Sequence, residues 1–523
     1  MFHSRLKSGA FAALLACTAF TALAVLPAHA AKTELRVGAA AADVGNLDPH
    51  FAASTSDRTL VAWIYGALVR FAPGTTDPST IEPDLAESWE ATDNNLVWTF
   101  KLRKGVQWQH GYGEVTADDV VFSLQKSADP KRSAYASDYA TFKSVEAVDA
   151  NTIRITLSRQ VPSMLGLLTN YAGGFIISKK AYEERGDGFT RNPVGFGPFQ
   201  LENTEPGVAI NFKAHDGYFR GKPKIEKVIY RFLNAAAGRD LAFASGEVDV
   251  VAGTIDQRWL QRMKATPGAK VDIFDPAELS IMHLNRNQKP FDDIRVRQAI
   301  AYAANPAQIA QFRGPEFTRV AKSVVPSNNL GLNPEPGLVL PDPEKAKALL
   351  AEAGYPDGIT IKMISSQLPS YAQTDQILQA QMAKAGIKLD LQPVEHATWH
   401  QMIRKDLSPI VEYSAARFPV ADTYLTQFFY SKSAIGQPGQ VTNFSHCNVA
   451  DKQIEAARTE TDPKKQVELW QEAQKLIVAD VCAVPLTETS QAWARSEKLE
   501  WGFELKGSLS LGPLLTEQAS FKD

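Results

Sequence analysis

Long apolar segments and an excess of one charge are both missing from most of this 523-residue chain. After Leu26 no apolar run approaches the ~20 residues that a membrane-spanning helix requires. Lysine and arginine together number 55 and aspartate and glutamate 58, so the formal net charge is −3. A mildly acidic chain has no basic field with which to attract nucleic acid or an anionic membrane. We therefore expect neither a membrane-embedded protein nor a nucleic-acid-binding one.

The long apolar stretch at the N-terminus has the features of a signal peptide. Arg5 and Lys7 precede an apolar core from residue 9 to residue 26, and Ala28-His29-Ala30 is a small-x-small cleavage site. We predict that residues 1–30 are removed by cleavage after Ala30 and that the protein is exported to the periplasm. Cleavage removes the two basic residues and no acid, which changes the net charge to −5. The segment that ends at Cys17 also resembles a lipobox, which leaves a lipid-anchored protein as the alternative.

Cysteine is scarce: of three in the chain, Cys447 and Cys482 remain after cleavage. The periplasm permits disulfide bonds. Cys447 precedes a helix expected near residues 451–460, and Cys482 follows another near residues 464–479. If these helices pack as an antiparallel hairpin, both thiols lie at the same end of it. We predict a structural disulfide between them, with two buried free thiols as the alternative.

Motifs of common enzyme classes are also missing. The chain contains neither a GxSxG nucleophile elbow nor a GxxxxGK[ST] phosphate loop. His396 and His400 have the i, i+4 spacing of two metal ligands on one helical face, but Ala397 stands where a metalloprotease needs glutamate. We predict no enzyme, no cofactor and no metal, and a secreted metal-dependent hydrolase is the lower alternative.

The length and local patterns of the mature chain indicate several α/β units. About 490 residues are more than one hydrophobic core usually organises, which indicates two or three lobes. Strands expected at residues 359–364 and 387–392, with a helix between them, favour a parallel or mixed sheet covered by helices. Helix starts are marked by a capping box and by three caps followed by proline: Thr116 with Asp119, Asn305-Pro306, Asp342-Pro343 and Asp462-Pro463.

Three blocks of sequence are more specific than these patterns. Residues 192–232 begin with NPVGFGPF, an elbow in which prolines fix φ and glycines tolerate positive φ. Val208, Ile210 and Phe212 then alternate with other residues, as expected of a half-buried strand. Residues 85–124 contain a further strand and the helix start with the capping box, and residues 290–300 read PFDDIRVRQAI.

In content and order, these blocks resemble the solute-binding proteins of peptide/nickel-type ABC importers, bacterial extracellular solute-binding protein family 5. The resemblance implies an α/β, two-domain periplasmic-binding-protein fold of type II (the large cluster C type) with an extra lobe inserted in domain 1. Domain 1 would comprise residues 31–53, 192–276 and 491–523. The inserted lobe would comprise residues 54–191 and domain 2 residues 277–490.

The resemblance also implies a function. The protein would be a monomeric periplasmic subunit that captures a peptide or peptide-like solute by hinge closure and delivers it to an inner-membrane ABC permease. A non-peptide solute (an opine, carboxylate, sugar-acid, aromatic or chelated metal) is the alternative within the same fold. A sensory role, in which the closed form is presented to a receptor, is a further alternative.

The segment from Tyr413 to Thr423 bears on the ligand. In peptide-binding relatives it tends to read W-x-x-D-x-x-D/E-P, and the first aspartate holds the α-ammonium of the ligand. Here Ala416 stands at the tryptophan and Pro419 at that aspartate. Because a buried ammonium without a carboxylate partner is costly, this disfavours peptides with a free amino terminus. The ligand-binding residues that the resemblance suggests are Phe51, Ser54, Thr55, Thr254, Glu278, Ser280, Trp399, Arg417, Phe418 and Asp422.

Arg417 and Phe418 are of particular interest within this set. An arginine offers a fork-shaped donor and a phenylalanine an apolar wall, which together suit a carboxylate-bearing or aromatic ligand. A solvated position for Arg417 in the loop is the alternative.

Overall fold

The computed structural model describes residues 32–52, 54–437 and 442–522. The predicted signal peptide and Cys17 lie outside the described residues. Among the helices of the described part, none has the length and apolar character needed to cross a membrane.

A mixed sheet of nine strands forms the centre of the fold. Its path is β10 (Phe199–Glu205), β11 (Ala209–Ala214), β12 (Lys227–Phe232), β1 (Glu34–Ala39), β13 (Val250–Ala252), β19 (Ala483–Ser496), β14 (Ala269–Leu284) and β18 (Ile410–Ala415), with β15 (Thr318–Val320) paired to β19 beside this path. Strand β1 runs parallel to β12 and β13, whereas the other pairs are antiparallel. The expected mixed sheet is therefore present.

The predicted half-buried pattern is wrong for β11. Ile210 and Phe212 are fully buried as expected, but Ala209 and Asn211 on the other face are buried too. Val208 lies just before the strand and is 54% exposed. The reason is the position of β11 inside the sheet, between β10 and β12, where both faces are covered.

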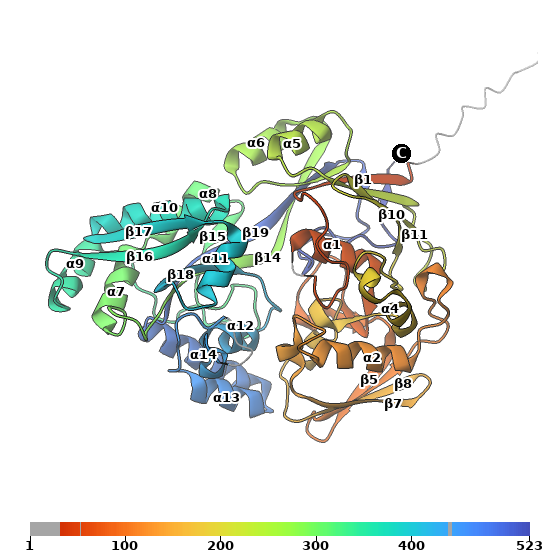
Figure 1. The fold of residues 1–523 in the computed structure, drawn as a ribbon, viewed down its shortest axis with the longest axis horizontal. Coiled ribbons are helices and arrows are strands. Elements are labelled where there is room, and N and C mark those ends of the chain that lie inside the picture. Colours follow the sequence, from red (N-terminus) through yellow and green to blue (C-terminus); the bar gives the residue numbers. More distant parts are fainter. Residues whose placement is uncertain (1–31, 53, 438–441, 523) are drawn as a thin grey trace, which may run out of the picture.

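Two long strands connect the two halves of the molecule. β14 and β19 are antiparallel partners from the pair Ala269–Ser496 to the pair His283–Ala483. Figure 1 shows them running between a part that contains α7 to α14 and a part that contains α1, α2 and α4. Their register shifts between Phe274 and Glu278, so the strand pair is irregular where it passes from one part to the other.

The segment from residue 54 to residue 191 carries an antiparallel sheet of its own. Its strands, in order, are β5 (Ala86–Thr92), β6 (Val97–Leu102), β8 (Thr152–Leu157) and β7 (Phe142–Asp149). Two short pairs, β2 (Gly66–Ala67) with β9 (Phe175–Ile176) and β3 (Val69–Phe71) with β4 (Ile81–Pro83), and helices α1 (Thr55–Ile64), α2 (Ala117–Ala128), α3 (Met164–Leu167) and α4 (Lys179–Arg185) complete it. The capping box of Thr116 and Asp119 at the start of α2 is confirmed.

The predicted βαβ unit lies in the other half. β16 (Ile359–Ser366) and β17 (Ile387–Val394) are parallel and are joined by α10 (Pro369–Lys384). The remaining helices are α5 (Ala236–Ala244), α6 (Gln257–Ala265), α7 (Ile294–Ala303), α8 (Pro306–Arg313), α9 (Pro343–Glu352), α11 (His396–Ile403), α12 (Ala421–Phe429), α13 (Asp451–Thr459) and α14 (Pro463–Ala479), and a short pair, β20 (Leu499–Glu500) with β21 (Ser520–Phe521), lies near the end. The expected caps Asn305, Asp342 and Asp462 each accept a hydrogen bond from the first turn of their helix.

The predicted disulfide between Cys447 and Cys482 is confirmed, with a Cα–Cα distance of 5.7 Å. Cys447 precedes α13 and Cys482 follows α14, and both are fully buried. The bridge therefore ties the α13–α14 hairpin to the start of β19. The domain boundaries given above stay predictions.

Candidate ligand-binding site

A cavity of about 700 Å³ lies between the two halves of the molecule. One wall comes from α1, from residues 134–141 and from residues 159–172 of the segment that carries the four-stranded sheet. The facing wall comes from Glu278 on β14, the start of α10, α11, the end of β18 with the loop after it, and α12. A solute in this cavity would therefore touch both halves at once.

Six of the ten suggested ligand-binding residues line this cavity, namely Ser54, Thr55, Glu278, Arg417, Phe418 and Asp422. The structure places the other four away from its lining. Phe51 lies against the buried Lys126, whose Nζ is 5.2 Å from the ring centre, and Thr254 follows β13. Ser280 is buried and donates to Glu412, whereas Trp399 is 1% exposed in the core.

Three charged side chains that interact electrostatically define one region of the cavity: Arg58, Glu278 and Arg417. Burial raises the pKa of Glu278, and the two arginines together with Arg313 oppose this effect. Burial alone would lower the pKa of Arg58, but Tyr171, Tyr135 and Glu278 raise it above its usual range, and the pKa of Arg417 is likewise raised. Both guanidinium groups are therefore charged at neutral pH.

Arg417 is held in place by its neighbours. Its Nε donates to Gln427 Oε1 at 2.7 Å, one terminal nitrogen donates to the carbonyl of Ala416 at 3.0 Å, and its backbone N–H donates to the Tyr424 hydroxyl. The guanidinium also lies 5.4 Å from the centre of the Phe428 ring. The remaining terminal nitrogen is free of hydrogen bonds within the described part of the chain, so Arg417 is fixed and still able to donate.

The other acids of the cavity lining have partners. Burial raises the pKa of Asp138 to about 6, and Arg417 and a hydrogen bond from Gln427 partly oppose it. Asp422 lies 3.8 Å from Nε of Arg458. Among the described lining residues there are five arginines against three acids, Arg58, Arg159, Arg404, Arg417 and Arg458 against Asp138, Glu278 and Asp422. The cavity lining therefore has an excess of positive charge.

Aromatic and histidine side chains supply much of the remaining polar surface. His396 and His400 both line the cavity, with ring centres 4.6 Å apart, and Nδ1 of His396 lies 2.9 Å from the Ser366 hydroxyl. Burial lowers the pKa of both rings, that of His400 to about 4, so both are neutral at pH 7. No group of three or more potential metal ligands occurs among the residues that the structure describes.

Sequence reasoning missed several lining residues. The most important are Arg58, Arg159, Tyr135, Tyr171, Tyr371, Arg404 and Arg458. They come from separate elements of the fold. Residues that are neighbours in the cavity are therefore not part of one short sequence motif. Only the i, i+3 position of Arg58 relative to the suggested Thr55 could have indicated it, since both lie on one face of α1.

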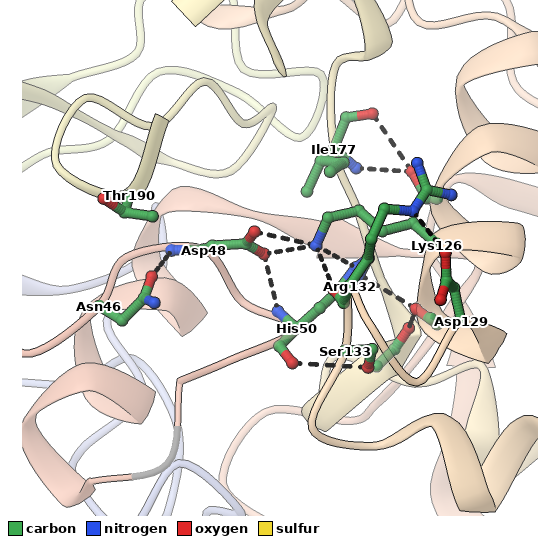
Figure 2. A network of polar contacts seen from close by, with 12 residues as sticks. Asn46, Asp48, His50, Lys126, Asp129, Arg132, Ser133, Ile177 and Thr190 are labelled. Carbon is green, nitrogen blue, oxygen red and sulfur yellow. Dashed lines mark hydrogen bonds and ion pairs between the residues drawn. The ribbon is translucent and has the colours of Figure 1, made fainter. Parts of the chain in front are cut away.

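A buried polar network holds the loop that leads into α1 (Figure 2). The Lys126 ammonium pairs with Asp48 at 2.9 Å and donates to Nδ1 of His50 at 3.2 Å and to the carbonyl of Arg132 at 3.0 Å. Burial and Lys126 lower the pKa of His50 to about 4, which keeps its ring neutral. The other ring nitrogen, Nε2, lies 2.9 Å from the Phe175 carbonyl. The network thereby joins the loop before Ser54 to α2.

Known proteins are similar to this chain in architecture and in sequence. The model of the bacterial extracellular solute-binding proteins, family 5 Middle, matches residues 80–436. The chain belongs to this family. Its expected type II, two-domain fold is confirmed by similar solved structures. A family 5 protein is the solute-binding subunit of an ABC importer and not an enzyme, so it binds a small molecule or peptide and delivers it to a permease.

Three family relatives illustrate the range of ligands. The dipeptide-binding protein of Escherichia coli K12 is 30% identical over 445 residues, 79% of this chain and 81% of the relative. The binding protein MoaA of A. tumefaciens R10, solved with mannopinic acid, is 64% identical with a TM-score of 0.88, over 94% of this chain and all of that one. The periplasmic binding protein DppA of Helicobacter pylori, solved with the peptide STSA, is 25% identical with a TM-score of 0.81, over 94% and 99%.

The loop that departs from the peptide-binding family pattern lies directly at the cavity. Ala416 contributes to the lining, whereas the Pro419 carbonyl accepts a hydrogen bond from Leu330. Phe418 reaches across to the other half, 5.7 Å from the Phe71 ring centre, and packs against Gly166. Through Phe418 the loop thus contributes an apolar contact between the halves.

Proposed function

We propose that this family 5 protein captures an opine-type solute, an amino acid joined through its nitrogen to a sugar-derived chain, with mannopinic acid as the leading candidate. The observation that carries the proposal is the 64% identity over 94% of the chain to a protein solved with mannopinic acid. At that identity the lining of the cavity is expected to be largely shared.

The chemistry of the cavity supports the same class of solute. Mannopinic acid carries two carboxylates, one secondary ammonium and a polyol, so its net charge at neutral pH is negative. Five lining arginines against three acids suit such an anion, because a guanidinium binds a carboxylate through two parallel hydrogen bonds. Tyrosine, serine, threonine and neutral histidine side chains in the lining are suitable partners for the polyol hydroxyls.

The wider biological setting is also part of the proposal. The chain is exported with cleavage after Ala30, acts in the periplasm as a monomer, and passes its solute to an inner-membrane ABC permease. Domain 1 with its inserted lobe (31–53, 54–191, 192–276 and 491–523) and domain 2 (277–490) close on the solute about β14 and β19. Contacts to both walls exist only in the closed form, so binding shifts the open–closed equilibrium.

Isothermal titration calorimetry on the purified mature protein tests the proposal. Mannopinic acid should bind far more tightly than glutamate, mannitol or a panel of dipeptides. At a concentration 100 times its Kd it should add about 2.7 kcal/mol to the free energy of unfolding. Tighter binding of dipeptides with free amino termini would overturn the opine assignment and restore the peptide reading. Native mass spectrometry of freshly isolated protein, which detects a co-purified solute, is the complementary measurement.

A further inference from the structure

We propose that Glu278 binds the ammonium of the solute and so takes the role of the aspartate that is missing at Pro419. This inference rests on the proposed function, because it requires a solute with a protonated amine. Glu278 lies on the strand β14, on the same wall of the cavity as the loop after β18.

The Glu278 carboxylate has unused acceptor sites. It lines the cavity, and within the described residues it forms no hydrogen bond and no ion pair within 4 Å. Its neighbours Arg58, Arg313 and Arg417 act on it only through longer-range attraction. A half-buried carboxylate with unused acceptor sites is stabilised when a ligand supplies a charged donor.

The two other acids of the lining, Asp138 and Asp422, have interactions that Glu278 lacks. Asp138 accepts from Gln427 and faces Arg417, and Asp422 is paired with Arg458. Asp422 is therefore already paired with a cation of the protein, and Asp138 already accepts a hydrogen bond. Among the three acids of the described lining, Glu278 is therefore the one that lacks both a hydrogen bond and an ion pair within 4 Å.

The charges around Glu278 match those of the proposed solute. Arg58, Arg313 and Arg417 attract Glu278, and Arg58 and Arg417 are the two of them in the cavity lining, so the cavity presents one acid with two arginines. The glutamate portion of mannopinic acid has the complementary pattern, one ammonium between two carboxylates. Each ligand charge then meets an opposite charge of the cavity, which a solute without the amine cannot achieve.

Glu278→Gln tests the inference, because it keeps the shape of the side chain and removes its charge. The probes are mannopinic acid and an analogue in which an ether oxygen replaces the amine nitrogen. Loss of a charged hydrogen bond should weaken mannopinic acid by about 10- to 100-fold. The ether analogue should bind the variant as well as it binds the wild type, or more tightly, because glutamine can donate to its oxygen.

Asp138→Asn is the matched control, since it neutralises another acid of the same cavity. It should affect both probes alike and change their ratio by less than about 3-fold. An equal loss of both probes in Glu278→Gln, or a Kd for mannopinic acid within about 3-fold of wild type, would overturn the role of Glu278. Circular dichroism and the melting temperature establish that each variant is folded.

The wild-type protein alone separates this inference from the proposed function. If it binds neither probe, the opine assignment fails. If it binds both equally well, the opine assignment stands and the ammonium subsite at Glu278 is wrong. A preference of about 10-fold or more for mannopinic acid supports the subsite even if Glu278→Gln does not fold, and Glu278→Asp, which retains the charge, should then retain that preference.

Discussion

Lys126→Met should strongly destabilise the protein, because it removes one partner of a fully buried ion pair. The Lys126 side chain is 0% exposed and that of Asp48 is 3% exposed. Methionine fills a similar volume but leaves the Asp48 carboxylate without its cation, and the Arg132 carbonyl and His50 Nδ1 without their donor. Breaking a buried pair in this way typically costs about 3–5 kcal/mol.

Thermal and urea unfolding measure this cost. With about 2.1 cal/mol/K per residue, unfolding the roughly 490-residue mature chain as one cooperative unit has an entropy near 1 kcal/mol/K. A loss of about 3–5 kcal/mol at the midpoint therefore lowers Tm by roughly 3–5 °C. If the lobes unfold separately, the shift is confined to the transition that contains α2 and is larger there.

The exposed pair Lys180–Glu184 in α4 provides the matched control. Its atoms are 3.9 Å apart and its side chains are 67% and 50% exposed. Lys180→Met should change the free energy of unfolding by less than about 0.5 kcal/mol. The reasoning is refuted if Lys126→Met is no more destabilising than Lys180→Met. Because the network holds the loop before Ser54, Lys126→Met should also weaken solute binding, which Lys180→Met should not.

Three further predictions follow from other parts of the structure. Replacing Cys447 and Cys482 by serine should cost roughly 3–4 kcal/mol, as expected for a bridge between residues 35 apart; unchanged urea unfolding under non-reducing conditions would contradict it. Burial lowers the pKa of His283 to about 3, below the value that this residue has in the unfolded chain. The stability that the neutral His283 ring contributes above pH 6.5 is therefore lost as the pH falls. Between pH 7 and pH 4 this amounts to on the order of 3 kcal/mol, and His283→Leu should remove that part of the slope; identical pH profiles would disprove the argument. Gly166→Ala should weaken solute binding by about 10-fold, because its Cβ would lie 2.2 Å from the Phe418 ring and hold the halves apart; equal calorimetric affinities would count against this.

Local structure could be predicted where its cause is local. The capping box of Thr116 and Asp119 and the cap at Asn305 depend on residues within one helical turn, and the structure contains both. The disulfide could be predicted because Cys447 and Cys482 flank two helices that were expected to pack as an antiparallel hairpin. The burial of Ala209 and Asn211 was not, since it depends on which strands lie beside β11 and what covers them.

The cavity could be predicted only in part, for the same reason. The resemblance indicated segments, and Ser54, Thr55 and Glu278 do lie in the lining. It could not say which side chains of a segment face inward: Trp399 packs in the core, 6.0 Å from the Tyr413 ring centre, while its helix neighbour His400 faces the cavity. The direction in which each side chain of α11 points depends on how this helix packs against β16 and β18. The sequence alone does not give that packing.

The distribution of charge over the two walls links the solute to closure. Arg58 lies on the wall that carries the four-stranded sheet, whereas Glu278 and Arg417 lie on the facing wall. A solute with one charged group can satisfy one wall and leave the other charges of the cavity without counter-charges. A solute with an ammonium and two carboxylates can engage Arg58, Glu278 and Arg417 together, and it does so only when the walls are close. With the opine proposed above as the solute, recognition of an amino-dicarboxylate and closure of the binding protein become the same event. A scaffold shared with peptide-binding relatives can in this way select a different solute through a few relocated charges.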